Sequence, residues 1–207
     1  MGNQIMYHLA RSAINLTDHQ RNIIVGTVLG DGSLIETASK NNLCLQIDHC
    51  NAQKEYVFWK YEALDLLVPT PPKYQSKNKS WRFRTISHPE LTEIGKLFYR
   101  NRIKVVPKEI ASLLTPLGLA VWFMDDGGRH PTGYLLNTQC FTKKELALLQ
   151  DALFRVFNIK HTSLHKNKNG WRLYIKAASR QHFRKIIEPF MLPQMMYKLE
   201  SPVETTR

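Results

Sequence analysis

Two stretches decide the fold of this 207-residue chain: IVGTVLGDG at residues 24–32 and LAVWFMDDG at residues 119–127. Each is an apolar run with the character of a helix, and each ends in an aspartate followed at once by glycine, a common helix stop. Asp31 and Asp126 are therefore expected in the last turns of two helices, near the negative end of the helix dipole, where an anion is disfavoured. Two acids placed alike in such a position indicate carboxylates that are held for a cation or a proton.

The sequence after the first of these aspartates predicts two strands, each followed by a helix. Residues 43–48 alternate apolar and polar side chains, as a half-buried strand does, and Asn51 is placed to cap the helix that follows. A second alternating strand covers residues 81–85, and Ser87 with Glu90 is expected to cap the next helix.

The sequence after the second aspartate repeats this order. A strand is expected near residues 134–139, and Thr142 with Glu145 forms a capping box that opens the next helix. The strand at residues 171–176 has the same alternation of apolar and basic side chains as its counterpart in the first half, and Ser179 is expected to open the last helix.

This repetition predicts an α+β fold of two pseudo-symmetric repeats, each ordered helix, strands, helix, strands, helix. The two aspartates are 95 residues apart, and the tryptophans of the paired strands, Trp81 and Trp171, are 90 residues apart. Repeat one is expected at about residues 17–110 and repeat two at about residues 114–200. No long low-complexity linker separates them, so we expect one compact unit over residues 1–207.

The charge balance favours a polyanionic partner. Lys and Arg number 29 against 17 Asp and Glu, which gives a formal net charge of +12. Nucleic acid is the first candidate and an anionic membrane the second, and a basic enzyme with neither partner is the remaining alternative. No apolar stretch approaches the roughly 18 residues of a membrane span, and no signal-peptide core is present near the start, so an intracellular protein is expected.

Basic side chains recur on the predicted strand faces in both halves. A two-stranded ribbon fits the DNA major groove, where Arg, Lys, Gln and Asn read base edges, although a solvated face is the default for any single strand. The candidate DNA-binding residues are Lys73, Lys77, Lys79, Arg82 and Arg84 in the first half, Lys166, Lys168, Arg172 and Lys176 in the second, and the amides Gln46, Asn137 and Gln139.

Gly26 and Gly30, four residues apart, give the first helix a bare stripe on which another helix can pack closely. If the two helices pack side by side, their ends bring Asp31 and Asp126 together, and the like charges would raise one pKa. A divalent metal such as Mg²⁺ would remove that repulsion, and beside a phosphodiester it could activate water. The alternative is that each aspartate caps a helix or forms a surface salt bridge.

These residues resemble the paired motifs of the LAGLIDADG homing endonucleases, in particular the single-chain members with two motifs. The resemblance is carried by residues 114–128, 136–142 and 192–199, in the same order and spacing. It implies a saddle of two β-sheets straddling duplex DNA, with the motif helices at a central interface. It also implies a monomer that cleaves both strands with Mg²⁺ or Mn²⁺, leaves short 3′ overhangs and promotes intron mobility.

The resemblance further implies which residues form the site. Asp31 and Asp126 take the place of the metal-binding acids, supported by the backbone carbonyls of Gly30 and Asp125. Asp125 makes the second acid ambiguous, and we choose Asp126 because it directly precedes a glycine, as Asp31 does. In the second motif Asp125 also stands where the first has the small Gly30, so a less symmetric helix contact is expected.

Two lysines match the active-site lysines of these enzymes. Lys104 follows Asp31 by 73 residues, and Lys198 follows Asp126 by 72. A lysine there could orient the attacking water or offset charge on the phosphate, whereas alone each would be read as a surface residue. Two rival functions stay open, namely an RNA-binding intron maturase and a DNA-binding regulator without catalysis.

Overall fold

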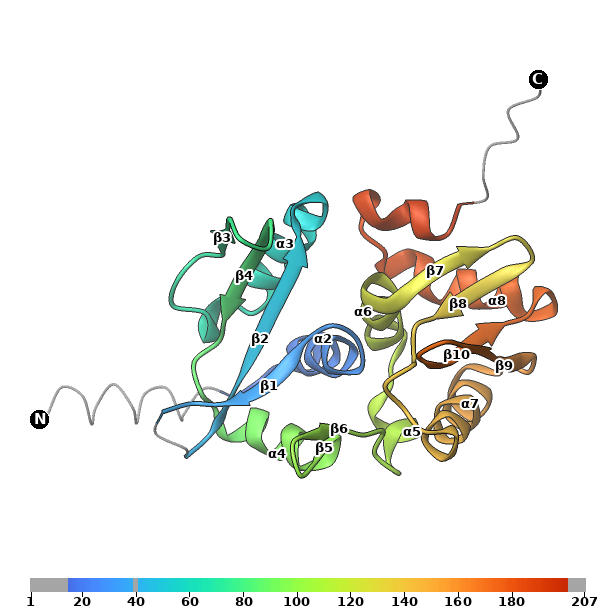
Figure 1. Cartoon of the computed structure of the whole chain (residues 1–207), viewed down its shortest axis with the longest axis horizontal. Helices are drawn as coiled ribbons and strands as arrows, with labels where there is room; N and C mark the ends of the chain where they lie inside the picture. Colours follow the sequence, from blue (N-terminus) through green and yellow to red (C-terminus); the bar gives the residue numbers. More distant parts are fainter. Residues whose placement is uncertain (1–14, 39–40, 201–207) are drawn as a thin grey trace, which may run out of the picture.

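The computed structural model describes residues 15–38 and 41–200 and shows two similar halves on either side of a central pair of helices (Figure 1). The first half contains α2 (Asp18–Leu29), β1 (Ser33–Glu36), β2 (Leu43–Cys50), α3 (Lys54–Ala63), β3 (Lys73–Gln75), β4 (Ser80–Arg84), α4 (Pro89–Phe98), β5 (Tyr99–Arg100), β6 (Ile103–Lys104) and α5 (Ile110–Leu113). The second contains α6 (Pro116–Asp126), β7 (Gly127–His130), β8 (Gly133–Leu136), α7 (Lys143–Phe157), β9 (Thr162–Asn167), β10 (Gly170–Ile175) and α8 (Ala177–Ile187), followed by 3₁₀ turns at Glu188–Phe190 and Pro193–Lys198.

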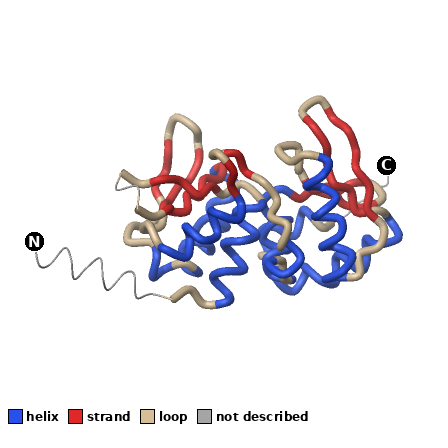
Figure 2. The backbone as a smooth tube through the Cα atoms, turned by 90° about the horizontal axis from the view of Figure 1, so that it is seen from below, coloured by secondary structure: helices blue, strands red, loops and turns tan. Residues whose placement is uncertain are grey.

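The two halves contain sheets of the same topology. The strand orders are β1-β2-β4-β3 and β7-β8-β10-β9, and every neighbouring pair is antiparallel. In Figure 2 the two sheets lie on one side of the molecule and the helices pack on the other. The predicted α+β fold is confirmed, and within residues 15–38 and 41–200 each sheet keeps one face free of helices.

The central helices α2 and α6 pack directly on each other through the predicted glycine stripe. A Cβ atom added to Gly26 would collide with the backbone carbonyl of Gly118 and lie 2.8 Å from the Cβ of Val121. One added to Gly30 would collide with the side chain of Asp125. Both glycines are therefore required by close approach of the two helices, and this approach brings the two helix ends together.

One predicted helix cap is confirmed. Thr142 with Glu145 forms the predicted capping box of α7. At the start of α6, for which no cap is predicted above, Thr115 accepts a hydrogen bond from the Gly118 amide. The predicted cap by Asn51 is wrong, because its side-chain oxygen accepts a 2.9 Å hydrogen bond from the Trp81 indole instead. Helix α3 begins at Lys54, after a short 3₁₀ turn, without a side-chain cap.

Two further predicted caps are also wrong. Helix α4 is capped by His88, whose ring nitrogen accepts from the Glu90 amide, rather than by Ser87. Ser179 lies inside α8, where its hydroxyl accepts from the His161 amide. In each case the serine correctly indicated that a helix begins nearby, but the residue at the N-cap lies one to three positions away from it.

The strand expected at residues 134–139 is shorter, and a strand before it was missed. Strand β8 ends at Leu136, and beyond it the Thr138 side chain replaces backbone pairing with β10. Its hydroxyl accepts from the Leu173 amide and donates to the Trp171 carbonyl. The missed strand β7 directly continues α6 and pairs with β8. Within residues 15–38 and 41–200, no helix is long and apolar enough to cross a membrane.

Candidate active site

Asp31 and Asp126 lie at the converging ends of the two central helices. Helix α6 ends at Asp126, whereas α2 ends at Leu29, so Asp31 lies in the turn beyond its helix and the predicted last-turn position is wrong for it. Burial raises the pKa of Asp126 to about 8, with further contributions from the charges of Asp31 and Asp125. Burial and then the charge of Asp125 raise the pKa of Asp31, whose side chain is still 47% exposed. The two acids interact, as the sequence predicted.

Lys104 and Lys198 each hold the backbone directly in front of one acid. Lys104 donates to the carbonyls of Gly30 at 2.8 Å and Gly32 at 2.9 Å. Lys198 donates to the carbonyls of Asp125 at 2.9 Å and Met124 at 2.5 Å. Burial lowers the pKa of both lysines, and the acids oppose that shift. This equivalence gives a geometric reason to pair Asp126, rather than Asp125, with Asp31.

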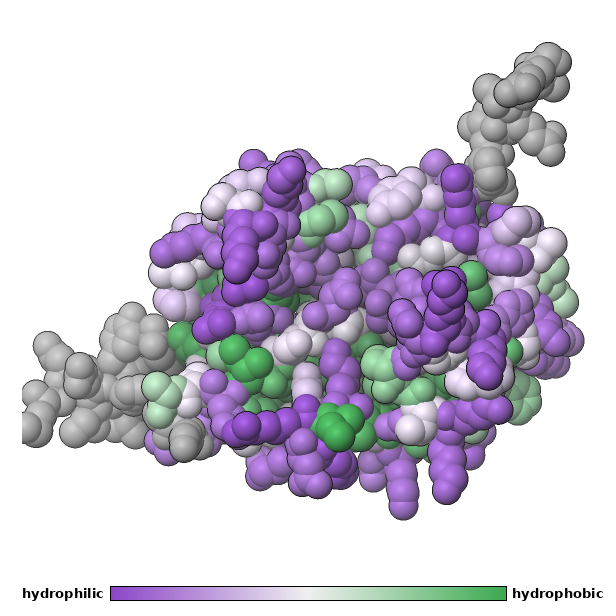
Figure 3. Space-filling model, in the orientation of Figure 1, coloured by the Kyte–Doolittle hydropathy of each residue, from purple (hydrophilic) through white to green (hydrophobic). Residues whose placement is uncertain are grey.

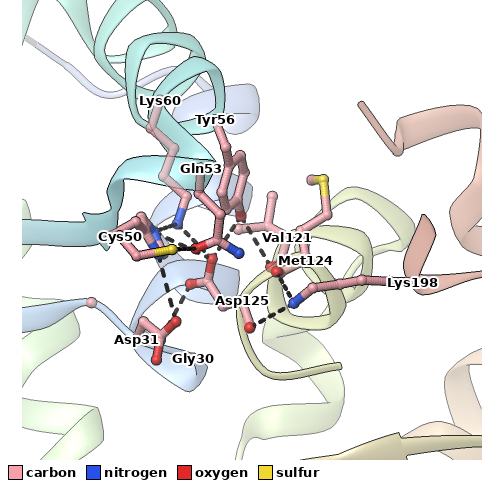
Figure 4. A network of polar contacts seen from close by, with 12 residues as sticks. Gly30, Asp31, Cys50, Gln53, Tyr56, Lys60, Val121, Met124, Asp125 and Lys198 are labelled. Carbon is pink, nitrogen blue, oxygen red and sulfur yellow. Dashed lines mark hydrogen bonds and ion pairs between the residues drawn. The ribbon is translucent and has the colours of Figure 1, made fainter. Parts of the chain in front are cut away.

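The side chain of Asp125 has a role that the sequence reading missed. Its carbonyl faces Lys198, as Figure 4 shows, but its carboxylate is fully buried and turns toward the first half. One oxygen accepts from Lys60 Nζ at 2.8 Å and from the Tyr56 hydroxyl at 2.7 Å. The other oxygen accepts a 3.3 Å hydrogen bond from the Asp31 amide.

His49 completes this buried cluster. Its Nε2 lies 3.2 Å from Lys60 Nζ, and its Nδ1 lies 3.6 Å from a carboxylate oxygen of Asp31. Burial and then the charge of Lys60 lower the pKa of His49 to about 4, so the ring is neutral at pH 7. Because Lys60 can only donate, Nε2 is the acceptor and Nδ1 carries the hydrogen that faces Asp31. A lysine four residues after the buried Tyr56, on the apolar stripe of a helix, was the signal in the sequence.

The donor sets bear on where a divalent cation can bind. Among the described residues, Asp31, His49 and Asp125 bring one ligand atom each within 4.8 Å of one another. The Lys60 ammonium group already lies against two of the three, so this cluster contains its own cation. The carboxylates of Asp31 and Asp126, with the carbonyls before them, are hard oxygen donors of the kind that Mg²⁺ prefers.

The open face of the first sheet carries most of its predicted DNA-binding residues. Strand pairing places Gln46 opposite Arg84 and Asp48 opposite Arg82, so these side chains share one face. Arg84 donates to the Gln46 side chain at 2.7 Å, and Arg82 donates twice to Asp48, at 2.8 and 2.5 Å. Lys73 pairs with Arg82 on the same face, while Lys77 and Lys79 are exposed in the β3–β4 turn. The acid Asp48 was not predicted.

The second sheet agrees less well with the prediction. Arg172 pairs with His165 on the open face, but Lys166 pairs with Trp171 on the opposite face, so its predicted placement is wrong. That face is covered by α7, from which Lys143 Nζ lies 4.2 Å from the Trp171 ring.

Figure 3 shows hydrophilic residues over much of the face that Figure 1 presents. The other candidates lie off the strands: Lys168 in the β9–β10 turn, Lys176 at the start of α8, and Asn137 and Gln139 after β8.

Comparison with known proteins agrees with this geometry. The model of the LAGLIDADG DNA endonuclease family matches residues 21–183. The probable intron-encoded endonuclease 1 of Wickerhamomyces canadensis is 30% identical over 89% of this chain and 85% of its own length. The cytochrome b mRNA maturase bI2 of Saccharomyces cerevisiae is 29% identical over 86% of this chain, which spans 46% of that protein. The structure of the homing endonuclease I-WcaI bound to its DNA recognition sequence superposes with a TM-score of 0.81, at 28% identity over 92% of this chain and 89% of that one.

Proposed function

Because the chain belongs to the LAGLIDADG DNA endonuclease family, we propose that it is a site-specific homing endonuclease that cuts both strands of a long duplex in the presence of Mg²⁺. The cut leaves short 3′ overhangs and promotes intron mobility. The observation that supports this most is the doubled unit of an acid, the carbonyl before it and a lysine on that carbonyl. Such a unit serves one scissile phosphate, and the chain carries two.

Different residues of the chain bind the DNA, position the acids and hold the cation. The open sheet faces carry the arginines, lysines and amides that contact the duplex, and they position it across the ends of α2 and α6. Lys104 and Lys198 fix the helix ends and place positive charge near both acids. A divalent cation on Asp31 and Asp126 would supply a water of lowered pKa and offset charge on the phosphate. Mn²⁺ fits the same oxygen donors.

We propose that one chain is sufficient for this activity. Each of the two repeats, at about residues 17–110 and 114–200, supplies one acid and one lysine. A monomer therefore contains both sets of catalytic residues. Double-stranded DNA is the substrate, and an intracellular location follows from that substrate. A second function, binding of intron RNA, is favoured by the similarity to a cytochrome b mRNA maturase.

The test is selection of Mg²⁺-dependent double-strand cuts from a library of random duplexes. The parent chain and Asp151→Asn, which changes an acid paired with Arg155 on α7, are expected to cut the same sequence. Asp31→Asn and Asp126→Asn are each expected to bind that sequence without making the double-strand cut. If both still cut at the parental rate, the assignment of the acids is wrong. Specific binding by the parent without any cut would support the regulator, and RNA splicing without a cut would support the maturase.

A further inference from the structure

The buried cluster around Lys60 makes the two halves of the site unequal. Asp125 belongs to the second half, but its carboxylate is bonded to Tyr56 and Lys60 of the first (Figure 4). The residue placed like Asp125 in the first half is Gly30, since each directly precedes its acid. Glycine has no side chain, so no contact can run in the opposite direction. The contact of Asp125 with the first half is therefore asymmetric because of the sequence itself, which has glycine at the matching position.

In the part of the second half that the structure describes, helix α7 buries no counterpart of Lys60. Helix α7 follows β8 as α3 follows β2, so the two helices correspond in the fold. The side chains that α7 buries are apolar, namely Leu146, Leu149, Ala152, Leu153 and Phe157. In α3 the buried set includes Tyr56 and the fully buried Lys60. One half therefore contains a fixed internal cation where the other contains hydrocarbon.

The cluster acts on Asp31. Lys60 holds the Asp125 carboxylate, which accepts from the Asp31 amide, and it also holds His49, whose Nδ1 faces the Asp31 carboxylate. In residues 15–38 and 41–200, the Asp126 carboxylate makes no hydrogen bond or ion pair; it interacts with its neighbours through charge alone. Asp31 is thus held at its amide, and the neutral His49 ring lies 3.6 Å from its carboxylate, before any substrate arrives.

We propose that Lys60 is a positioning residue for Asp31, and that the enzyme cuts its two strands in a fixed order, beginning with the strand that Asp31 serves. The inference rests on the proposed endonuclease function. A preorganised acid needs less rearrangement when the phosphate arrives, so its strand is cut faster. The Asp126 side must order its carboxylate during the reaction and follows second.

The test measures each strand separately under single-turnover conditions. Duplexes labelled on one strand or the other are cut with excess enzyme in Mg²⁺, and duplexes already nicked in one strand isolate the other. Lys60→Met is expected to slow the first strand by about tenfold or more while slowing the second by less than about threefold. Tyr56→Phe, which removes one hydroxyl and keeps the ring, is expected to shift the strand ratio in the same direction. Lys96→Met, on an exposed lysine of α4 that pairs with Glu93, is the matched control and should leave both rates unchanged.

The outcomes separate this inference from the function on which it rests. Metal-free binding of the duplex and the melting temperature are measured for every variant. If Lys60→Met does not fold, the strand rates of Tyr56→Phe alone test the inference. Asp31→Asn on the nicked duplexes identifies the strand that Asp31 serves, which must be the strand that the parent cuts first. Equal slowing of both strands by Lys60→Met or Tyr56→Phe, or by Asp31→Asn, overturns the inference while the endonuclease stands. Parental cutting by both Asp31→Asn and Asp126→Asn would instead overturn the assignment of the acids.

Discussion

Lys104 and Lys198 perform the same structural task on opposite sides of the central helix pair. Each ammonium group donates to the carbonyl of the residue just before an acid, Gly30 at 2.8 Å and Asp125 at 2.9 Å. Each also holds a second carbonyl close by. The lysines therefore fix the helix ends as well as bringing charge, and both tasks are lost together when the ammonium group is removed.

Replacing either lysine should reduce cutting more than binding. Lys104→Met and Lys198→Met are each expected to lower the cleavage rate by at least about tenfold, because the charge beside the phosphate and the position of one acid change together. Affinity for the duplex without metal should fall by less than about threefold, since one of many phosphate contacts is lost at most. Lys108→Met, on an exposed lysine near Lys104 in the sequence, is the control. An equal loss of binding and cutting would show that these lysines are ordinary DNA contacts.

The raised pKa of Asp126 predicts how the metal-free protein responds to pH. In the folded chain this carboxyl keeps its proton up to about pH 8, whereas in the unfolded chain it loses it near 3.8. The stabilisation is therefore complete below pH 3.8 and is lost as the pH rises through 8. The lowered pKa of His49 works in the opposite sense, since its contribution is present above pH 6.5 and is lost as the pH falls through about 4.

Between pH 6.5 and 8, Asp126 should therefore set the slope. The free energy of unfolding of the metal-free chain is expected to fall by up to about 2 kcal/mol over this range, a drop in melting temperature of several degrees. Asp126→Asn should flatten the dependence, and the affinity of the parent for Mg²⁺ should increase as the pH rises because the cation displaces the proton. Thermal scans with a chelator present check this. If the stability of Asp126→Asn depends on pH as steeply as that of the parent, the proton is held by another group.

The buried pair of Lys60 and Asp125 predicts a stability difference between single and double variants. Lys60→Met leaves the Asp125 carboxylate buried without its cation, and losing one partner of such a pair costs roughly 3–5 kcal/mol. Lys60→Met combined with Asp125→Asn leaves no buried charge and should recover a large part of that loss. Chemical unfolding in urea gives both values. If the double variant is no more stable than Lys60→Met, the buried charge is not the source of the cost.

The sequence was sufficient to predict that Asp31, Asp126, Lys104 and Lys198 lie near the ends of the two central helices, because these positions depend on order and spacing along the chain. Thr142 with Glu145 was found for the same reason, since a capping box is a local pattern. The cluster of Lys60, Tyr56, His49 and Asp125 was not found, because its members come from β2, α3 and α6, and the Asp125 side chain has room there only because Gly30 lacks one. The wrong face of Lys166 has a similar cause, since its register is set by pairing with β10 and not by its own neighbours.

The glycine stripe makes a prediction whose sign is informative. Gly26 lies inside a helix, where alanine would normally stabilise by roughly 0.5–1 kcal/mol. Here the added methyl would meet the Gly118 carbonyl and the Val121 side chain, so Gly26→Ala should instead destabilise by roughly 1–3 kcal/mol. Gly128→Ala is the control, because a Cβ there meets nothing within 4 Å. Melting temperatures compare the two, and a stabilised Gly26→Ala would mean that the helices are further apart.

The Arg82–Asp48 pair predicts a specific readout on the open face of the first sheet. Asp48 accepts from both Nε and one terminal nitrogen of Arg82, which fixes the plane of the guanidinium group. An arginine held in this way suits recognition of one base pair, so Arg82→Ala should cost about 1–3 kcal/mol of binding and relax specificity at a single position. Asp48→Asn should lower specificity at that same position while raising affinity for unrelated duplexes, because it removes a negative charge from a DNA-facing surface.

Binding is measured by fluorescence anisotropy on the target and on duplexes with one base pair changed, at several salt concentrations. Lys166→Ala is the matched control, since this exposed lysine lies on the face of the second sheet opposite Arg172. It should change affinity little and specificity not at all. If Arg82→Ala weakens binding to every duplex by the same factor, Arg82 contacts the phosphate backbone instead. In that case Asp48 would serve to neutralise charge rather than to aim the arginine.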